Sequence, residues 1–166
     1  MGEALGSILV STAALGICAV VAAVLTAVRG PIVTSAGELR SAVRMAILVT
    51  LLQSAHFSEE LVTGFASRYP ELLGLAPLPS AFFISFNAFW IAVWALSCWG
   101  LAHRRRLALF PLWFLGIACL LNGLAHPAFA LLTGGYFSGL LTSPLVGVAG
   151  FLLLRRLARV TDDPGR

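Results

Sequence analysis

The sequence is poor in charged residues. Only 11% of its 166 residues are Asp, Glu, Lys or Arg, whereas a soluble domain carries about 25%. Lysine is absent altogether, so all 11 basic residues are arginines. Because 59% of the residues are hydrophobic and the mean hydropathy is +0.94, the composition excludes an ordinary soluble domain and predicts an integral membrane protein.

Cysteine is also scarce, and the sequence alone pairs none of the three residues. Cys18, Cys98 and Cys119 are isolated in apolar runs, and no Cys-x-x-Cys pair occurs. We expect these thiols to be small apolar fillers. The formal net charge is +4, but the arginines lie at the ends of apolar segments. They indicate membrane topology, so we expect membrane lipids as partners and no nucleic acid.

Five apolar segments follow one another along the chain, each near the roughly 20 residues that cross a bilayer. They cover residues 4–28, 41–66, 80–101, 107–133 and 137–154. We therefore predict an all-α, polytopic membrane helix bundle of about five transmembrane helices, with one domain over residues 1–160 and a polar tail over 161–166. The first segment carries Glu3 where a secretory signal would be positive, so we interpret it as a transmembrane helix.

The arginines indicate the orientation of these segments. In a five-span arrangement, Arg68 is the only arginine on one side of the membrane, and the other ten lie on the opposite side. The positive-inside rule makes the arginine-rich side cytoplasmic. We expect the N-terminus outside and the C-terminus in the cytoplasm.

One polar cluster interrupts the second apolar segment. His56, Glu59 and Glu60 stand at helical positions i, i+3 and i+4, so all three project from one face. An ionisable group at bilayer depth costs at least about 2.5–3.5 kcal/mol, so the cluster needs a partner, a metal, a proton or water. With the segment ending at Ala66, His56 is about 15 Å deep. The alternative is a helix that stops at Ala55 and leaves the acids in a wet loop.

A second polar face lies in the fourth segment. Asn122 and His126 are one turn apart, with His126 about 10 Å from the outer end of its helix, and Asn87 reaches a similar depth in the third segment. Pro127 should bend the helix beside His126. We expect a polar pocket walled by aromatic residues and covered by the turn at 134–139. The alternative for His126 is a packing histidine bonded to a backbone carbonyl.

Three motifs resemble those of the HXXEE family of bacterial integral membrane proteins. They are the His-x-x-Glu-Glu run from His56 to Glu60, the Asn122-x-x-x-His126 pair, and Tyr136-x-x-Gly139, in which Ser138 stands where the family has proline. The likeness covers most of the chain after the first segment. It implies a polar intramembrane centre in the bacterial cytoplasmic membrane and says little about the substrate.

The leading functional hypothesis is a small membrane metalloenzyme. His56, Glu60 and His126 would bind a divalent metal, because two imidazoles and a carboxylate with an open position match a catalytic zinc site. The same set could hold iron, although we favour zinc. Glu59 would act as a base, Asn122 would orient a ligand or polarise a substrate carbonyl, and Tyr136 would donate a proton.

A site in the outer half of the bilayer implies a lipid or another apolar substrate that enters laterally, and hydrolysis is the first reaction type to test. Two alternatives remain open at this point. A metal-free pocket of the same residues could isomerise or cyclise a polyprenyl or sterol-like lipid. The carboxylates could instead carry protons or ions in a membrane binding or transport protein.

Overall fold

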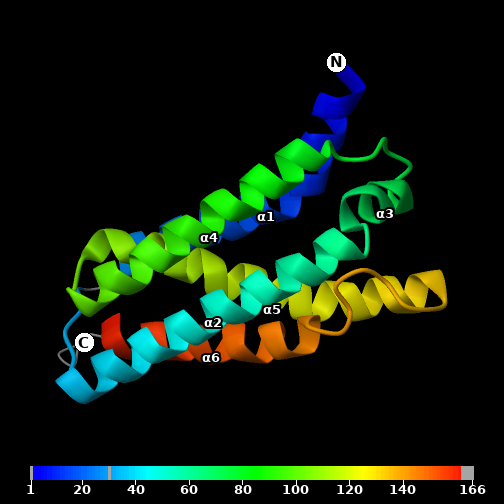
Figure 1. Cartoon of the computed structure of the whole chain (residues 1–166). Helices are drawn as coiled ribbons and strands as arrows, with labels where there is room; N and C mark the ends of the chain where they lie inside the picture. The colour runs from blue at the N-terminus through cyan, green and yellow to red at the C-terminus, as the bar shows by residue number, and fades with distance from the viewer. Residues whose placement is uncertain (1, 30, 162–166) are drawn as a thin grey trace.

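A computed structural model describes residues 2–29 and 31–161 of the chain (Figure 1). These residues form helices and connecting loops, with no strand among them. The elements are α1 (Gly2–Val28), α2 (Ala36–Val62), α3 (Phe65–Leu72), α4 (Ser80–Ala102), the 3-10 turn η1 (Arg106–Ala108), α5 (Leu109–Thr133) and α6 (Ser143–Thr161). The prediction of an all-α protein is confirmed, and the expected tail over 161–166 lies outside the described residues except for Thr161.

Three of the helical segments are long and apolar enough to cross a membrane. They are Ala4–Val28, Ser80–Ala102 and Arg106–Thr133. The remaining long helices carry more charge, since α2 contains Glu59 and Glu60 and α6 contains Arg155, Arg156 and Arg159. The chain is therefore a helical protein with potential membrane spans, and a total of five spans stays a prediction.

The five long helices run in alternating directions in chain order (Figure 1). α3, its links to α2 and α4, and the connection between α5 and α6 lie at one end of the bundle, and the connections from α1 to α2 and from α4 to α5 lie at the opposite end. At this second end, arginine side chains connect separate chain segments by hydrogen bonds to backbone carbonyls. Arg104 donates hydrogen bonds to the carbonyls of Ile32 at 3.0 Å and Thr34 at 2.9 Å, and Arg106 donates to that of Thr26 at 3.1 Å.

The second predicted segment has different bounds in the structure. α2 begins at Ala36 because the Ser35 hydroxyl accepts a hydrogen bond from the Glu38 amide, an N-terminal cap. It ends at Val62, not at residue 66, because Gly64 adopts a left-handed φ of +79° and the chain turns into α3. His56 is then about 9 Å from the helix end instead of about 15 Å. The alternative end at Ala55 is also wrong, since the helix continues through the polar cluster.

The last predicted segment is shifted toward the C-terminus. α6 begins at Ser143 and not at residue 137, and it continues past residue 154 to Thr161. Residues 134–142 are instead a folded connection, bounded by Gly134, which ends α5 at φ +70°. Its course is set by hydrogen bonds to α2, so the sequence alone did not distinguish it from the start of a helix.

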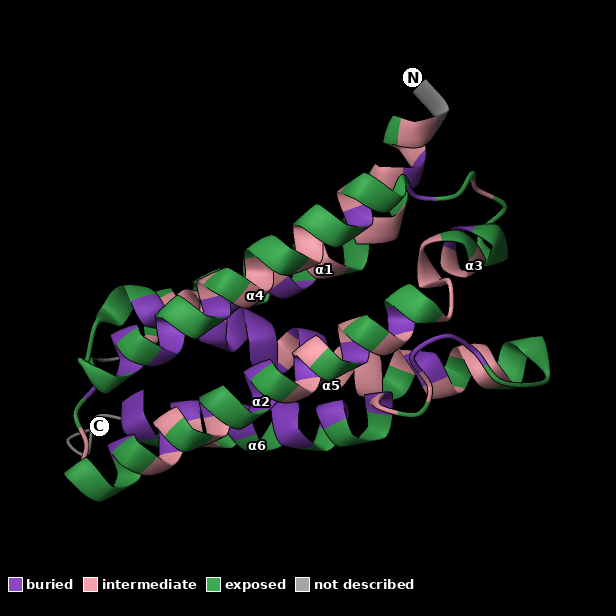
Figure 2. Ribbon diagram, in the orientation of Figure 1, coloured by how far each residue is buried: buried purple, intermediate pink, exposed green. Residues whose placement is uncertain are grey.

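α5 is the central helix, with α1, α4 and α6 packed around it. Its contact with α6 is closest at two glycines, where a Cβ added to Gly123 would meet the Gly147 Cα at 2.6 Å. The absence of side chains at these two positions permits the close approach of the helices. α5 stays helical through Pro127 to Thr133. Buried residues face the middle of the bundle, whereas the outer faces are exposed (Figure 2) and carry many large hydrophobic side chains.

Candidate metal centre

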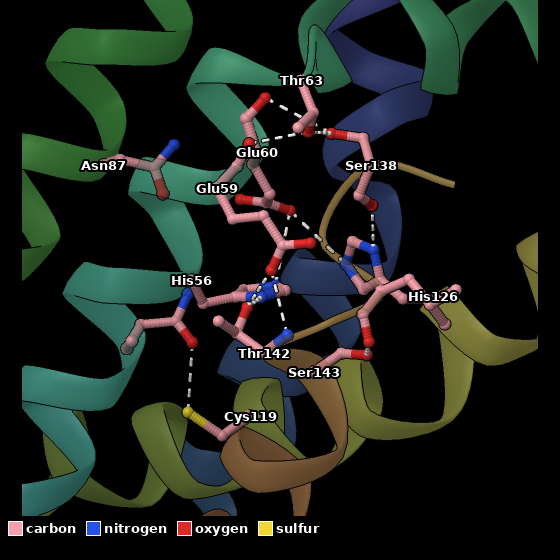
Figure 3. A network of polar contacts seen from close by, with 12 residues as sticks. His56, Glu59, Glu60, Thr63, Asn87, Cys119, His126, Ser138, Thr142 and Ser143 are labelled. Atoms are coloured by element: carbon pink, nitrogen blue, oxygen red, sulfur yellow. Dashed lines mark hydrogen bonds and ion pairs between the residues drawn. The ribbon is translucent and has the colours of Figure 1, made fainter. Parts of the chain in front are cut away.

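His56 and Glu60 from α2 meet His126 from α5 inside the bundle (Figure 3). One potential ligand atom from each residue lies within 4.8 Å of the other two. The three residues are buried, with exposed fractions of 0%, 6% and 1% respectively. The structure therefore brings together the three residues expected to hold a metal ion, and the group could hold one.

Glu60 stands between the two imidazoles. Its Oε1 lies 3.5 Å from His56 Nε2 and 3.4 Å from His126 Nε2. A direct N–H···O hydrogen bond is shorter, at about 2.7–3.2 Å. Ligand atoms at about 2.0–2.1 Å from a tetrahedral zinc are about 3.3 Å from one another. The two measured spacings therefore fit ligands arranged around one ion better than direct hydrogen bonds.

The His56 ring is oriented by Thr142, the last residue of the connection before α6. The Thr142 hydroxyl donates to Glu59 Oε2 at 2.6 Å, and since its one proton is used there, it accepts from His56 Nδ1 at 2.7 Å. The proton of the ring therefore sits on Nδ1. In the neutral ring, Nε2 of His56 carries the lone pair, and this atom has no hydrogen-bond partner among the described residues.

The His126 ring is oriented in the same sense by the connection between α5 and α6. Its Nδ1 lies 2.5 Å from the Ser138 carbonyl oxygen, which can only accept, so Nδ1 carries the proton. Both Nε2 lone pairs then face the Glu60 carboxylate. This arrangement is electrostatically unfavourable unless a cation or a proton lies among the three groups. Metal-binding histidines typically donate their other ring N–H to a carbonyl or carboxylate in this way.

Glu59 lies beside the triad formed by His56, Glu60 and His126 and is not part of it. Its carboxylate accepts from the Tyr136 hydroxyl at 2.7 Å, from the amides of Leu141 and Thr142 at 3.0 and 2.9 Å, and from the Thr142 hydroxyl. Burial, together with the hydrogen bond to Glu59, raises the pKa of the Tyr136 phenol, so the phenol stays protonated and donates. Glu59 therefore holds residues 136–142 against α2, and the catalytic roles expected of Glu59 and Tyr136 stay predictions.

The connection between α5 and α6 covers the triad, as the expected lid would. Ser138 is fully buried, and its hydroxyl lies 2.5 Å from the Thr63 hydroxyl at the end of α2. Gly139 packs directly on the two histidines. A Cβ at this position would lie 2.5 Å from His126 Cε1 and 2.9 Å from His56 Cε1, and the backbone has a φ of +84°. Only glycine fits here without moving the imidazoles.

Thr142 and the Ser138 carbonyl were not predicted from the sequence as groups that orient the two histidine rings. Thr142 is 86 residues from His56, and a threonine after an apolar run carries no pattern of its own. The one sequence signal near these groups was the Tyr136-x-x-Gly139 motif, which was interpreted as a turn. The alternative for His126, a bond to a backbone carbonyl, is correct for its Nδ1, and this bond leaves Nε2 free to bind an ion.

A cavity of about 240 Å³ adjoins the triad, and Glu60 and His126 form part of its wall. Asn122 and Asn87 also line it, so the expected polar pocket includes both amides. Asn87 Nδ2 donates to the Phe83 carbonyl at 2.9 Å. Most of the remaining lining is apolar or aromatic, from α1, α3, α4 and α5: Leu15, Phe65, Tyr69, Phe82, Phe83, Phe86, Trp90, Trp94, Phe114, Leu121 and Phe129.

Comparisons with known protein families, with curated proteins and with solved structures give no match. The resemblance to the HXXEE family therefore rests on the three motifs alone and stays a prediction. Functional conclusions depend on the geometry around His56, Glu60 and His126.

Proposed function

We propose that this protein is an integral membrane metalloenzyme whose divalent metal is held by His56, Glu60 and His126. One observation carries the proposal. Both histidines direct Nε2, the acceptor nitrogen of each neutral ring, at the same carboxylate oxygen, at 3.5 and 3.4 Å, in a buried space. A cation removes the repulsion that three such acceptors would otherwise experience.

Zinc is the metal we favour, because two histidines and one carboxylate with an open fourth position are a common catalytic zinc set. Iron is the second choice, since the same ligands occur in oxygenases of the two-His-one-carboxylate type. A bound metal of this kind lowers the pKa of a coordinated water and polarises a carbonyl oxygen. Hydrolysis of a lipid ester or amide is therefore the reaction class to test first.

The protein's own residues have separate roles in this proposal. Thr142 and Ser138 fix the protonation of the two imidazoles, and Glu59 holds Thr142 in place. Asn122, in the cavity wall, would orient a polar group of the substrate. Tyr136, whose hydroxyl donates to Glu59, would supply a proton to a leaving group if the connection moved. Excluding bulk water from the triad is the function of the turn around Gly139.

In the proposed orientation all five long helices cross the bacterial cytoplasmic membrane. The alternating directions of the helices and the arginine-rich end support this arrangement. The arginine-rich end would face the cytoplasm by the positive-inside rule. The triad lies near the C-terminal ends of α2 and α5, away from the arginine-rich end. It would then be in the outer half of the bilayer, where lipids could reach it laterally.

The same contacts support one second candidate, a metal-free acid–base enzyme. Glu60 lies within ion-pair distance of both histidines, so one shared proton could replace the cation. Such a pocket would move protons in the isomerisation or cyclisation of an apolar substrate. The longer-than-hydrogen-bond spacings favour the metal over this candidate.

Elemental analysis of the purified protein tests the proposal. We expect about one zinc or iron per chain in the wild type, little metal in Glu60→Gln, and wild-type content in Glu71→Gln, a matched change at an exposed glutamate of α3. Metal-dependent release of nitrophenolate from a long-chain p-nitrophenyl ester would then support hydrolysis. A wild type that stays metal-free after incubation with zinc and with ferrous iron would refute the metal site.

A further inference from the structure

Four buried side-chain nitrogen or oxygen atoms have no hydrogen-bond partner among the described residues. One of them, His56 Nε2, belongs to the triad. Two others, Ser11 Oγ in α1 and Trp94 Nε1 in α4, belong to residues that line the cavity beside the triad. Folded proteins pair nearly all of their buried polar groups, so each exception needs an explanation. A molecule bound in this cavity could pair both of them.

Trp94 is the more informative of these two residues. Its exposed fraction is only 5%. The indole stacks on Trp90 and lies beside Phe114, at ring-centroid distances of 5.9 and 6.2 Å, so aromatic neighbours fix its orientation. An indole N–H can donate a hydrogen bond but cannot accept one. A buried donor costs free energy unless it meets an acceptor, so the cavity beside Trp94 suits a molecule that brings one.

Gln53 of α2 lies at the same level of the bundle as Trp94. The two helices face each other where Thr50 Oγ1 lies 3.8 Å from Cys98 Sγ. Gln53 follows Thr50 by three residues, and Trp94 precedes Cys98 by four. Because α2 and α4 run in opposite directions, both steps lead toward the triad by about one helical turn. Both residues also line the cavity, so they contribute to one region of its wall.

The amide of Gln53 offers a second donor in this region. The residue is buried, with an exposed fraction of 6%. Its Oε1 accepts from Cys119 Sγ of α5 at 3.3 Å. Since the thiol engages the oxygen, the remaining polar group of the amide is the NH2, which can only donate. The cavity wall therefore carries two donors at one level, from Gln53 and Trp94.

These donors indicate the chemical class of the ligand. No arginine is present among the described residues that line the cavity, so an anion bound here would be buried without a cation. Burying an unpaired charge costs far more than burying a polar group that is hydrogen-bonded. A carbonyl, ester or hydroxyl oxygen carries no charge and can accept from both donors. The Ser11 hydroxyl, from α1, offers the same ligand a further partner.

We infer that Gln53 and Trp94 form a second polar subsite in the cavity, which binds an uncharged oxygen acceptor on an otherwise apolar ligand. Gln53 is seven residues from Glu60, two turns along the same face of α2, so this oxygen would lie about 10 Å from the triad. Binding at the subsite does not require the metal. Taking the ligand as the substrate rests on the proposed function, and the substrate would then carry an uncharged oxygen about 10 Å from its reacting group.

The indole N–H resonances of the full-length protein in detergent test the subsite. The chain has four tryptophans, and Trp94→Phe and Trp113→Phe assign two of their signals. The probes are cyclohexanone, which carries one acceptor oxygen, and methylcyclohexane, which has nearly the same shape and no oxygen. We expect cyclohexanone alone to move the Trp94 signal downfield, and to do so saturably. Trp113 is the matched control, because its Nε1 is also buried without a partner and it does not line the cavity.

A pair of substitutions tests the second donor. Gln53→Met keeps the length of the side chain and removes the amide, so the loss of one hydrogen bond should weaken cyclohexanone binding about fivefold. Thr12→Val is the control in the same cavity wall, because the Thr12 hydroxyl already donates to the Ile8 carbonyl at 2.7 Å. Its affinity for cyclohexanone should equal that of the wild type. If circular dichroism shows that Gln53→Met does not fold, the wild-type titrations with the two probes decide the inference.

Several results would overturn the inference. Equal shifts of the Trp94 signal with both probes would show an apolar cavity without a polar subsite. Equal shifts of the Trp94 and Trp113 signals would show general partitioning of the ketone into the bundle. A Trp94 signal that does not respond to cyclohexanone would also refute the subsite, and cross-relaxation of that signal with water would then identify a bound water as the partner of the indole.

The same titration separates the subsite from the metal proposal. A cyclohexanone shift of the Trp94 signal that persists in Glu60→Gln supports the subsite, whatever the metal content of the wild type. A wild type that binds metal, but whose Trp94 signal does not respond to cyclohexanone, would refute the subsite and leave the metal site intact.

Discussion

Replacing Gly139 with alanine is the sharpest test of the triad's geometry. The new Cβ would lie 2.5 Å from His126 Cε1, 2.6 Å from His126 Nδ1 and 2.9 Å from His56 Cε1. Ordinary contact begins at 3.4 Å, so the His126 ring or the connection must move by about 0.9 Å. Such a shift disturbs the bond from Nδ1 to the Ser138 carbonyl and changes the distance from Nε2 to Glu60.

We expect two contributions to the loss of folding free energy in Gly139→Ala, and a separate effect on zinc binding. An alanine at a φ of +84° costs about 1–2 kcal/mol of folding free energy. Overpacking against the imidazoles adds about 1–3 kcal/mol. Metal sites tolerate ligand displacements of about 0.2 Å, so a 0.9 Å shift should weaken zinc binding by about 10- to 100-fold or more, the range seen when groups that orient a ligand are disturbed.

Gly134→Ala is the matched control. Gly134 lies in the same connection with a φ of +70°, and an added Cβ there meets nothing within 4 Å. It should lose only the backbone contribution and keep wild-type zinc affinity. The assay is competition with a chromophoric zinc chelator in detergent, at equal helicity by circular dichroism. Equal zinc affinities for Gly139→Ala and Gly134→Ala would refute the placement of Gly139 on the two histidines.

Three further predictions follow from the same contacts. Thr142→Val should lower zinc affinity by about 10- to 100-fold, measured by the same competition assay, because it removes the group that orients His56. Glu60→Gln should lose most of the metal, whereas Glu59→Gln should retain it and lose turnover, and metal loss in Glu59→Gln instead would reverse the two assignments. A cysteine at Gly135 should react with an impermeant maleimide in intact cells, whereas a cysteine at His103 should react only after permeabilisation. The three native cysteines are buried, so they should add little background labelling. The opposite pattern would invert the topology.

Much of the site could be predicted from local sequence. His56 and Glu60 are one helical turn apart, and Asn122 and His126 repeat this spacing, so each pair shares a face whatever the rest of the chain does. The cost of burying ionisable groups then indicated that the two faces meet. The structure agrees for His56, Glu60 and His126, because helical periodicity depends only on residues a few positions apart.

Other features depended on contacts between distant residues. The contacts of Glu59 are with the backbone of residues 141 and 142, more than 80 positions away. The residues next to Glu59 in the sequence, Glu60 among them, therefore do not predict these contacts. Residues 137–142 are apolar enough to resemble the start of a span, yet hydrogen bonds to Glu59 and the left-handed Gly139 hold them as a folded connection.

Composition, the arginine pattern and the i, i+4 spacings determined by themselves an apolar, all-helical chain and the identity of three candidate ligands. Only the tertiary structure decided which nitrogen of each imidazole faces Glu60, because that depends on Thr142 and the Ser138 carbonyl. It also decided the place of the cavity, which lies where α1 and α4 pack on α5 and leave space between them. The place of the cavity and the protonation of the rings are collective properties of several helices, and no single stretch of sequence encodes them.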